Sequence, residues 1–403
     1  MKVWRKRIGM IAALALLLCM FAAVAEPTMK ETVKGGKVVR REWTDESGAL
    51  TPGPEGYAYM TRSISGTTVT EKFYDAEGNP VMVTGGYYGQ MLTYGNRHRL
   101  EEVVYLDQDG RKAECAQGYA RLRIVYTSKG MVTSAGYYDR NNDLVMVPGL
   151  GYAAVRSEYR GSAATKTTYL DDQKRPVDIP QGYAVRIQTV NKSNRITSIR
   201  FEHADGSPAV CAEGWASCKR ELDKKNREVS IKYYDLAGQL IIQDGGYAYE
   251  EREWDGDDSC TLSRYDASGN RITLAGGAEK IRQDYSKDGQ IIRETCLNAT
   301  GKANPDDEGV AVRTYLYDGE GHLVQTRFAD ASGRATMSRG GYAGYSETLD
   351  ADGFRTVRTY VDTEGKAVNT AEGYSEIRYV YDASRQITAR EYYDVNGTLI
   401  KKD

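Results

Sequence analysis

The segment KYYDLAGQLIIQDGGYA, residues 232–248, contains two short patterns that recur through the rest of the sequence. The first is an aromatic residue followed by Asp and Gly, here Tyr233, Asp235 and Gly238. The second is the Gly-Tyr-Ala step of residues 246–248. Asp starts such turns because its carboxylate can accept bonds from backbone amides two residues on, and Gly ends them because it tolerates positive φ. Each copy of the first pattern therefore predicts a turn at the end of a strand.

Both patterns recur with a period close to 32 residues. The aromatic position of the first pattern holds Trp43, Phe73, Tyr105, Tyr137, Tyr169, Phe201, Tyr233, Phe328, Tyr360 and Tyr392, with degenerate copies at Arg264 and Cys296. The aromatic position of the Gly-Tyr step holds Tyr57, Tyr87, Tyr119, Tyr152, Tyr183, Trp215, Tyr247, Tyr342 and Tyr374, and the aromatic is lost at Ala278 and Val310. Two markers that keep one period indicate a tandem repeat.

Each unit reads as two strands and two turns. A Gly-Tyr-Ala step leads into a polar strand, then a weaker first turn such as residues 126–130, a second strand and the Asp turn. A lone hairpin is marginal in water, so neighbouring units must stabilise one another. A twist of roughly 20° per strand prevents a sheet of about 24 strands from staying flat. The sequence predicts an all-β fold of about 11–12 tandem 32-residue β-hairpin repeats, forming a coiled or superhelical antiparallel, β-solenoid-like array.

The N-terminus has the pattern of a secretory signal peptide, residues 1–25. A basic start precedes an apolar run over residues 8–22 and the small-residue site Ala23-Val24-Ala25. We expect cleavage before Glu26, with an uncleaved N-terminal anchor as the alternative. Residues 26–403 are expected to form a single continuous repeat array without a membrane span. The expected location is secreted or on the surface of a bacterial cell, through the general secretory route.

The composition is dominated by tyrosine and glycine, with 31 Tyr against 5 Phe and 4 Trp, and 42 Gly. Glycine is suited to the turns. Tyrosine has an apolar ring and a polar hydroxyl, which suits strands with one solvent-exposed edge. The net charge is −2, and removing the four cations of residues 1–25, which include no acids, leaves −6. Charges of both signs are interspersed, so nucleic acid and anionic lipid are not expected partners.

Five cysteines follow the signal peptide: Cys115, Cys211, Cys218, Cys260 and Cys296. Cys115 and Cys211 occupy the same position of the repeat, in units that lie three repeats apart in the sequence. Disulfides between Cys211 and Cys218 or between Cys260 and Cys296 fit the repeat. A disulfide-dependent repeat would carry one pair per unit, so isolated buried thiols are the preferred interpretation.

The chain resembles the tyrosine-rich β-hairpin repeat proteins of bacteria. The segment Tyr317-Asp318-Gly319-Glu320-Gly321-His322-Leu323 resembles the YD (RHS-type) repeat. The segment Tyr233-Tyr234-Asp235-Leu236-Ala237-Gly238 is similar to MORN-type hairpin variants of exported proteins. The likeness covers nearly all of residues 30–400, although the added Gly-Tyr-Ala step departs from both patterns. It implies β-hairpin arrays with interaction roles at the surface or outside the cell, and it supplies no catalytic residues.

Groups typical of catalysis or metal binding are sparse. His98, His203 and His322 lie in different units and different slots, so they form no Ser-His-Asp or zinc pattern and are expected to face solvent in turns. The acidic turns at residues 255–258 and 306–308 carry oxygens of the kind that Ca²⁺ prefers, but they match no known loop pattern. We predict no catalytic, cofactor or metal residues, and plain polar turns at both segments.

The aromatic residues of the Gly-Tyr steps are the candidate binding residues. Their regular spacing would present a ladder of rings for sugar stacking, formed by Tyr57, Tyr87, Tyr119, Tyr152, Tyr183, Trp215, Tyr247, Tyr342 and Tyr374. The alternative, preferred for most of the set, is that each ring packs over the adjacent unit.

The preferred function is a non-enzymatic, exported repeat protein that binds a cell-wall or extracellular polysaccharide through repeated weak sites whose avidity sums along the array. The alternative is a protein-interaction or adhesin-like surface scaffold with a surface protein as partner. An enzyme is the least favoured interpretation, because near-equal units offer no unique pocket.

Overall fold

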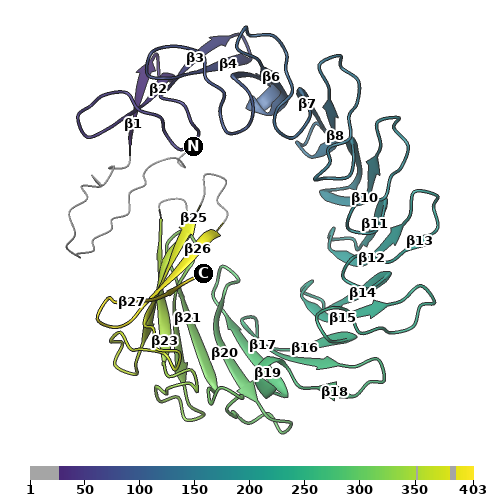
Figure 1. Cartoon of the computed structure of the whole chain (residues 1–403). Helices are drawn as coiled ribbons and strands as arrows, with labels where there is room; N and C mark the ends of the chain where they lie inside the picture. Colours follow the sequence, from purple (N-terminus) through teal and green to yellow (C-terminus); the bar gives the residue numbers. More distant parts are fainter. Residues whose placement is uncertain (1–26, 351–352, 382–386) are drawn as a thin grey trace. The chain divides into compact units, whose positions relative to one another are not determined.

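A computed structural model describes residues 27–350, 353–381 and 387–403 (Figure 1). The predicted signal peptide, residues 1–25, lies outside the described residues. In the described ranges, regular structure consists of 27 β-strands and two short 3₁₀-helices, and all strand pairings that join them are antiparallel. No helix in this part of the chain is long and apolar enough to cross a membrane. The predicted all-β array of tandem hairpins is confirmed.

The described residues divide into two compact units, which we describe separately. The N-terminal unit consists of residues 27–220 and 233–239. It contains β1 (Thr28–Lys34), β2 (Lys37–Thr44), β3 (Tyr59–Ser65), β4 (Thr68–Tyr74), β5 (Gly89–Tyr94), η1 (Asn96–His98), β6 (Leu100–Leu106), β7 (Arg121–Tyr126), β8 (Val132–Tyr138), β9 (Ala154–Arg160), β10 (Ala163–Leu170), β11 (Val185–Val190), β12 (Ile196–Glu202) and β13 (Pro208–Ala209).

The C-terminal unit consists of residues 221–232 and 240–403. It contains β16 (Tyr249–Asp255), β17 (Ser259–Tyr265), β18 (Arg271–Ile272), η2 (Ala275–Gly277), β19 (Lys280–Tyr285), β20 (Ile291–Leu297), β21 (Val312–Tyr317), β22 (Leu323–Ala329), β23 (Gly344–Leu349), β24 (Arg355–Val361), β25 (Glu376–Tyr381), β26 (Ile387–Tyr393) and β27 (Leu399–Lys402). Two further strands, β14 (Ser217–Leu222) and β15 (Glu228–Tyr234), each have residues in both units. The prediction of one continuous array over residues 26–403 stays a prediction.

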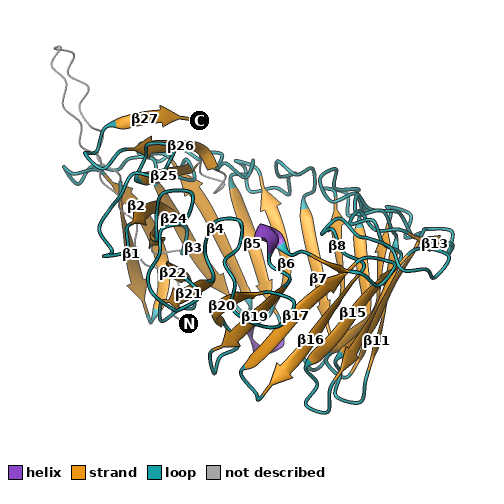
Figure 2. Cartoon of the chain, turned by 90° about the horizontal axis from the view of Figure 1, so that it is seen from below, coloured by secondary structure: helices purple, strands orange, loops and turns teal. Residues whose placement is uncertain are grey.

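Within each unit, consecutive hairpins pair edge to edge in chain order. In the N-terminal unit, β5 pairs with β4 on one side and with β6 on the other, and β6 then pairs with β7. Figure 2 shows β3 to β7 side by side, with loops at both ends of the strands. The two strands of a hairpin overlap fully, whereas strands of successive hairpins pair over only a few residues. The residues that follow each second strand therefore have to complete the contact between hairpins.

Each repeat contains a third turn, which lies at the Gly-Tyr step. The sequence pattern does not reveal it as a separate turn, because the turn and the step share residues. After β6, the Asp107 carboxylate accepts bonds from the amides of Asp109 and Arg111 at 3.0 and 2.8 Å. The chain then returns along β6 and turns again, with the Cys115 amide donating to the Tyr119 carbonyl at 2.9 Å. Gly118 in this turn has φ +85°. The sequence predicts two turns in each unit, and the structure adds this third one.

The Ala of the Gly-Tyr-Ala step joins one hairpin to the next through its backbone. The Tyr105 amide at the end of β6 donates to the Ala120 carbonyl at 2.9 Å, and the Ala120 amide donates to the Tyr138 carbonyl of β8 at 2.8 Å. The same pair of bonds forms at Ala58, Ala153, Ala184, Ala311 and Ala343. These alanines have 0–1% of their surface exposed, so only a small side chain fits the joint.

The hydrophobic core follows the third turns rather than a central layer. One cluster joins Tyr57, Met60 and Phe73 to Val83, and another joins Cys115 and Tyr119 to Val147. The position that begins the third turn is buried and apolar in most repeats of the N-terminal unit, where it holds Val83, Cys115, Val147, Ile179 and Cys211. The core of the described residues is thus a series of small clusters at the hairpin joints.

In several hairpins, a second contact with the preceding hairpin comes from an aromatic residue at the end of the first strand. The Tyr126 hydroxyl donates to the Leu100 carbonyl of the preceding hairpin at 2.8 Å. Equivalent bonds run from Tyr159, Tyr317 and Tyr381 to Val132, Ile291 and Arg355, and the Trp254 indole donates to Glu228. The sequence pattern marks these positions only as the start of a weak turn.

All five described cysteines are buried thiols that form no disulfide within the described residues. The preferred interpretation of isolated buried thiols is confirmed, and neither the Cys211–Cys218 nor the Cys260–Cys296 bridge forms. Cys115 and Cys211 occupy the apolar slot of the third turn, where Val and Ile also occur, so they act as small hydrophobic residues.

Candidate functional site

The predicted ladder rings alternate with the rings at the ends of the second strands. The Tyr105 ring, for example, lies between those of Tyr87 and Tyr119, at centroid distances of 4.5 and 5.7 Å. Such pairs stabilise by about 0.5–1.5 kcal/mol each beyond the area they bury. In the N-terminal unit the run joins Tyr57, Phe73, Tyr87, Tyr105, Tyr119, Tyr137, Tyr152, Tyr169, Tyr183, Phe201, Trp215 and Tyr233. In the C-terminal unit it joins Phe328, Tyr342, Tyr360, Tyr374 and Tyr392.

These ring contacts explain why the two patterns share one period. Of the candidate ladder, Tyr57, Tyr119, Trp215 and Tyr374 are buried, and Tyr87, Tyr152, Tyr183, Tyr247 and Tyr342 are half-buried. Burial raises the pKa of Tyr87 and of Tyr152 to about 12, because the phenolate would lose its hydration. The structure brings the ladder together as packing between hairpins, and a stacking role for a ligand stays a prediction.

Where the aromatic pattern degenerates, charges replace rings. The Arg264 guanidinium lies over the Tyr247 ring at 4.2 Å, and its Nε is 3.0 Å from the Glu250 carboxylate. Glu250 is buried and also pairs with Arg252 at 2.7 Å. The sequence could not show this substitution, because Arg264 simply appears as a missing aromatic in the repeat.

Half-exposed tyrosines with a cation over the ring occur on the opposite strand face. In the N-terminal unit, Arg40 lies 3.8 Å from the Tyr59 ring centroid, and Arg121 lies 5.4 Å from that of Tyr138. Tyr59 also stacks on Tyr74 at 4.9 Å. In the C-terminal unit the same arrangement pairs Lys232 with Tyr249, Arg271 with Tyr265, and Arg378 with Tyr393. The sequence does not predict these pairs, because each needs the strand register to bring the cation to the ring.

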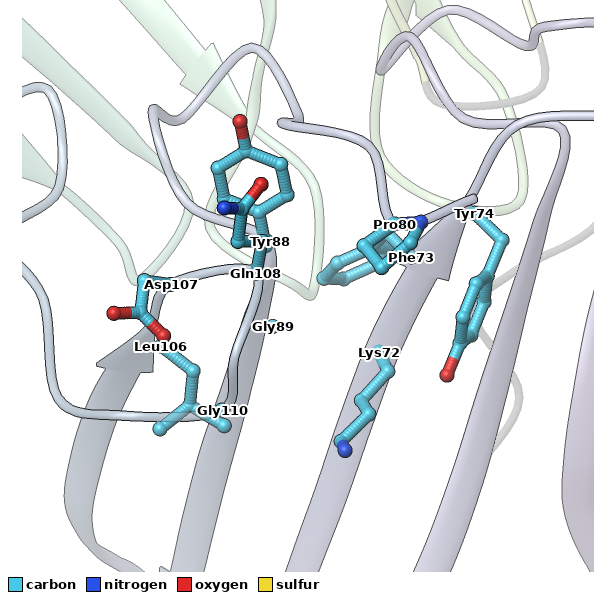
Figure 3. A pocket seen from close by; sticks show the side chains of 10 residues that line it. All are labelled: Lys72, Phe73, Tyr74, Pro80, Tyr88, Gly89, Leu106, Asp107, Gln108 and Gly110. Carbon is cyan, nitrogen blue, oxygen red and sulfur yellow. The ribbon is translucent and has the colours of Figure 1, made fainter. Parts of the chain in front are cut away.

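A small pocket on that face forms where one of these side chains is missing. Gly89 on β5 pairs with Lys72 on β4 and Leu106 on β6, whereas the matching positions of β3 and β7 carry Tyr59 and Arg121. The space that Gly89 leaves has a volume of about 120 Å³ and is lined further by Phe73, Tyr74, Pro80, Tyr88, Asp107, Gln108 and Gly110 (Figure 3).

The Gly89 pocket offers one cation. A Cβ at Gly89 would lie 2.7 Å from the Glu71 carbonyl, so a larger residue cannot fill the site. The Asp107 carboxylate already holds its own turn, and Lys72 has no ion pair within the described ranges. The pocket can therefore take a small polar group that carries an acceptor or a negative charge.

A second pocket, of about 180 Å³, lies on the ring-stack face of the C-terminal unit. We call it the β22 pocket, after its central strand. Its lining comes from three strands and the adjacent third turns: Glu308, Arg313, Tyr315, Thr326, Phe328, Ser338, Tyr342 and Tyr345. The matching strand pair is apolar in some repeats, as in Val103–Leu122 and Leu262–Ile281, and polar in others, as in Glu71–Gln90. The β22 pocket lies at one of the pairs that include a polar residue.

The walls of the β22 pocket are held by charged hydrogen bonds. Arg313 donates to the Asp306 carboxylate at 2.5 Å, and the Tyr315 hydroxyl donates to that of Glu294 at 2.6 Å. Burial disfavours the Arg313 cation, but its bond to Asp306 and the negative charge of that carboxylate, together with smaller contributions from Cys296 and Tyr315, raise the pKa of Arg313. Burial and the bond to Glu294 both raise the pKa of Tyr315. Both side chains keep their ordinary protonation near neutral pH.

The histidines and acidic turns do not gather into a site. His98 is exposed, and the Nδ1 atoms of His203 and His322 lie 2.6 and 3.1 Å from the carboxylates of Asp178 and Asp318. The carboxylate of Asp306, in the second acidic turn, bonds the amides of that turn and Arg313. Over the described residues, no group of three or more His, Cys, Asp or Glu side chains could hold a metal ion.

Comparison with known proteins gives only weak likeness. No family model and no curated protein matches the sequence. Two solved structures cover 93% of this chain: TcdB2-TccC3 without its hypervariable C-terminal region (TM-score 0.29, 10% identity) and the Photorhabdus luminescens Tc holotoxin pore (TM-score 0.26, 13% identity). This chain spans about a fifth of each, 22% and 21%. A porin-like protein from Bacteroides uniformis has a TM-score of 0.18 at 9% identity, with 82% of this chain and 93% of that chain covered. At such scores the likeness carries no argument. The repeat itself shows the coarser class, a tyrosine-rich β-hairpin repeat protein.

Proposed function

We propose that this protein is an exported, non-enzymatic repeat protein that binds a cell-wall or extracellular polysaccharide through several weak sites. The observation that carries the proposal is the recurrence of half-exposed tyrosines with a cation over the ring on one strand face of each unit. Aromatic rings bind the apolar faces of sugars, and a cation beside the ring can bind an acidic or hydroxyl group. Weak sites on one polymer chain add through effective concentration.

The finer repeat type belongs to the same proposal. We infer that the units are variants of YD- and MORN-type repeats. The Tyr317–Gly321 segment is an example of the turn that such repeats share, and a turn of this type forms the first or the second turn of a unit. Support comes from Asp318, whose carboxylate accepts bonds from the amides of Glu320 and His322 at 2.9 Å. Export rests on residues 1–25, and mass spectrometry of protein from the culture medium should find a mature N-terminus at Glu26.

Co-sedimentation with isolated bacterial cell walls tests the binding proposal. We expect residues 26–403 to pellet with the walls and to be released by soluble polysaccharide. The double variant Arg40→Gln with Arg378→Gln removes one ring-bound cation from each unit and should weaken pelleting several-fold. Surface charge interactions weaken with salt, so release by salt is also expected.

The matched control replaces two arginines that lie over no ring. Arg111 and Arg334 are exposed turn residues paired with Asp109 and Asp330. The variant Arg111→Gln with Arg334→Gln has the same net charge as the test variant and should pellet like the unaltered protein. An equal loss of pelleting in both variants would show that the effect comes from net charge alone. Protein that stays in the supernatant would favour the alternative, a surface scaffold for a protein partner.

A further inference from the structure

Two buried hydroxyl groups in the β22 pocket have no hydrogen-bond partner within the described part of the chain. Thr326 on β22 is 1% exposed, and Ser338 in the following third turn is 7% exposed. Neither Thr326 Oγ1 nor Ser338 Oγ has a partner, and both residues line the β22 pocket. A buried hydroxyl left unpaired destabilises the fold, because it has lost its hydrogen bonds to water. A ligand that bonds both groups would recover this loss on binding.

The remaining walls define the chemistry of that ligand. Phe328, Tyr342 and Tyr345 supply aromatic surface, and Tyr345 pairs directly with Thr326 across the sheet. Arg313 is already paired with Asp306, and the exposed Glu308 adds a carboxylate that can accept from hydroxyl groups. The pocket thus combines aromatic surface, hydroxyls that can donate or accept, and a carboxylate acceptor, which fits a neutral ligand with many hydroxyl groups.

The size of the pocket limits the ligand to a single small ring. Its volume of about 180 Å³ lies below the roughly 300–1,000 Å³ typical of pockets for drug-sized ligands. A pyranose ring has an apolar face that packs on an aromatic ring, and a rim of hydroxyl groups. Both features match the lining of the β22 pocket.

We propose that the β22 pocket is a binding subsite for one neutral hexose residue, with Thr326 and Ser338 hydrogen-bonded to its hydroxyl groups. This inference rests on the proposed function, because it names the sugar-reading site of the C-terminal unit. It assigns to this pocket the recognition of a single residue, whereas the ring–cation pairs bind along the polymer.

Saturation-transfer NMR on the full chain with a panel of neutral methyl hexopyranosides tests the subsite. We expect at least one hexoside to show transfer, and the acyclic hexitol sorbitol to show none. The double variant Thr326→Val with Ser338→Ala should weaken binding roughly tenfold, the loss of two hydrogen bonds. It breaks no internal bond, so its melting temperature should stay the same or rise.

Thr370 provides the matched control. It occupies the Ser338 slot one hairpin later, is buried, and its hydroxyl also has no partner in the described ranges, but it does not line the pocket. Thr370→Val should bind the hexoside like the unaltered protein. Glu308→Gln, an exposed change that spares the fold, should weaken binding by a smaller factor.

The outcomes separate this inference from the proposed function. Pelleting with cell walls but no hexoside transfer, or equal binding by the double variant and Thr370→Val, would overturn the subsite and leave polymer binding intact. Hexoside binding that is lost in the double variant, without pelleting of the unaltered protein, would support the subsite and overturn polymer binding.

Discussion

At the scale of single residues, Gly86 shows why the third turn needs glycine. Its φ is +80°, a left-handed conformation that costs other residues about 1–2 kcal/mol. A Cβ there would also lie 2.7 Å from the Ala116 amide nitrogen of the next third turn. That amide donates to the Gly85 carbonyl at 2.9 Å, so the two turns are bonded directly. Gly86 therefore serves both its own turn and the joint.

We expect Gly86→Ala to destabilise the protein more than Gly118→Ala. Gly118 has φ +85°, but no atom lies within 4 Å of the position that a Cβ would take, so its replacement costs only backbone strain, about 1–2 kcal/mol. Gly86→Ala adds a clash with backbone, worth about 1–3 kcal/mol more. Urea unfolding followed by circular dichroism measures both. Equal losses would show that successive third turns are not in close contact in solution.

The Asp turns make part of the free energy of unfolding depend on pH in the acidic range. The Asp330 carboxylate accepts bonds from the Ser332 hydroxyl and amide at 2.6 and 2.8 Å and from the Arg334 amide at 3.0 Å. These bonds, led by that of the Ser332 hydroxyl, lower its pKa from 3.8 to about 2. Because the folded pKa is depressed, the contribution is complete above about pH 4 and is lost as the pH falls towards 2.

We expect Asp330→Asn to remove this pH dependence and to keep the turn. Asn298 forms the same turn, accepting from the amides of Thr300 and Lys302 at 3.0 Å each. The difference in urea midpoint between the unaltered protein and the variant should therefore shrink between pH 4 and pH 2. A constant difference over that range would contradict the assignment of the pKa to this turn.

At the scale of the hairpin, we predict that Tyr126→Phe destabilises the protein by about 1 kcal/mol. The change removes the bond from the hydroxyl to the Leu100 carbonyl, which is worth about that much. Tyr94 occupies the same slot one hairpin earlier, and its hydroxyl has no hydrogen bond within the described residues. Tyr94→Phe should therefore change the free energy of unfolding by less than about 0.5 kcal/mol. Equal effects would show that this bond does not hold hairpins together.

The hairpins themselves can be predicted from the sequence because their signals are local. Asp107 and Gly110 bond or bend within five residues, so spacing alone locates the turn. The third turn escapes the repeat pattern, since its bonds join Cys115 to Tyr119 across the very residues that mark the Gly-Tyr step. In several repeats its signal is present in the sequence as an apolar residue shortly before the Gly-Tyr step, such as Val83.

The candidate sites depend on register, which the repeat period does not supply. Whether Arg121 meets Tyr138, or Thr326 meets Tyr345, follows from the pairing of strands that are distant or staggered in sequence. The period gives the residue numbers of the ladder rings, but it does not show which residues pack against them. A period fixes which residues are equivalent, and only the sheet register fixes which ones touch.

At the scale of each whole unit, the tyrosine stack predicts unfolding in alkali. The folded pKa of Tyr87 and of Tyr152 is raised from 10 to about 12, so the neutral phenol is favoured in the fold. Their contribution is complete below pH 10 and is lost as the pH rises through 12. We expect strand circular dichroism and phenolate absorbance to change together over that range. Phenolate formation near pH 10 with intact strands would contradict a buried stack.

The variant Tyr87→Phe with Tyr152→Phe tests whether those rings cause the transition. Phe73 and Phe201 already occupy the stack, so a ring without a hydroxyl fits. The variant should move the alkaline midpoint to higher pH and leave the neutral midpoint little changed. An unchanged alkaline midpoint would place the sensitive groups elsewhere.

The backbone bonds at Ala120 bear on how such a chain can change in length over generations. Because each joint repeats the same pair of bonds, tandem duplication of a 32-codon stretch would give a new hairpin whose two edges already fit its neighbours. Smaller insertions have to lie where they leave the backbone bonds between hairpins unchanged. The interval from Tyr119 to Tyr152 holds one residue more than the usual 32, and the extra residue lies in the third turn, where the Val147 amide spans to the Tyr152 carbonyl. Lineages of this gene should therefore differ by whole hairpins, or by single residues confined to turns.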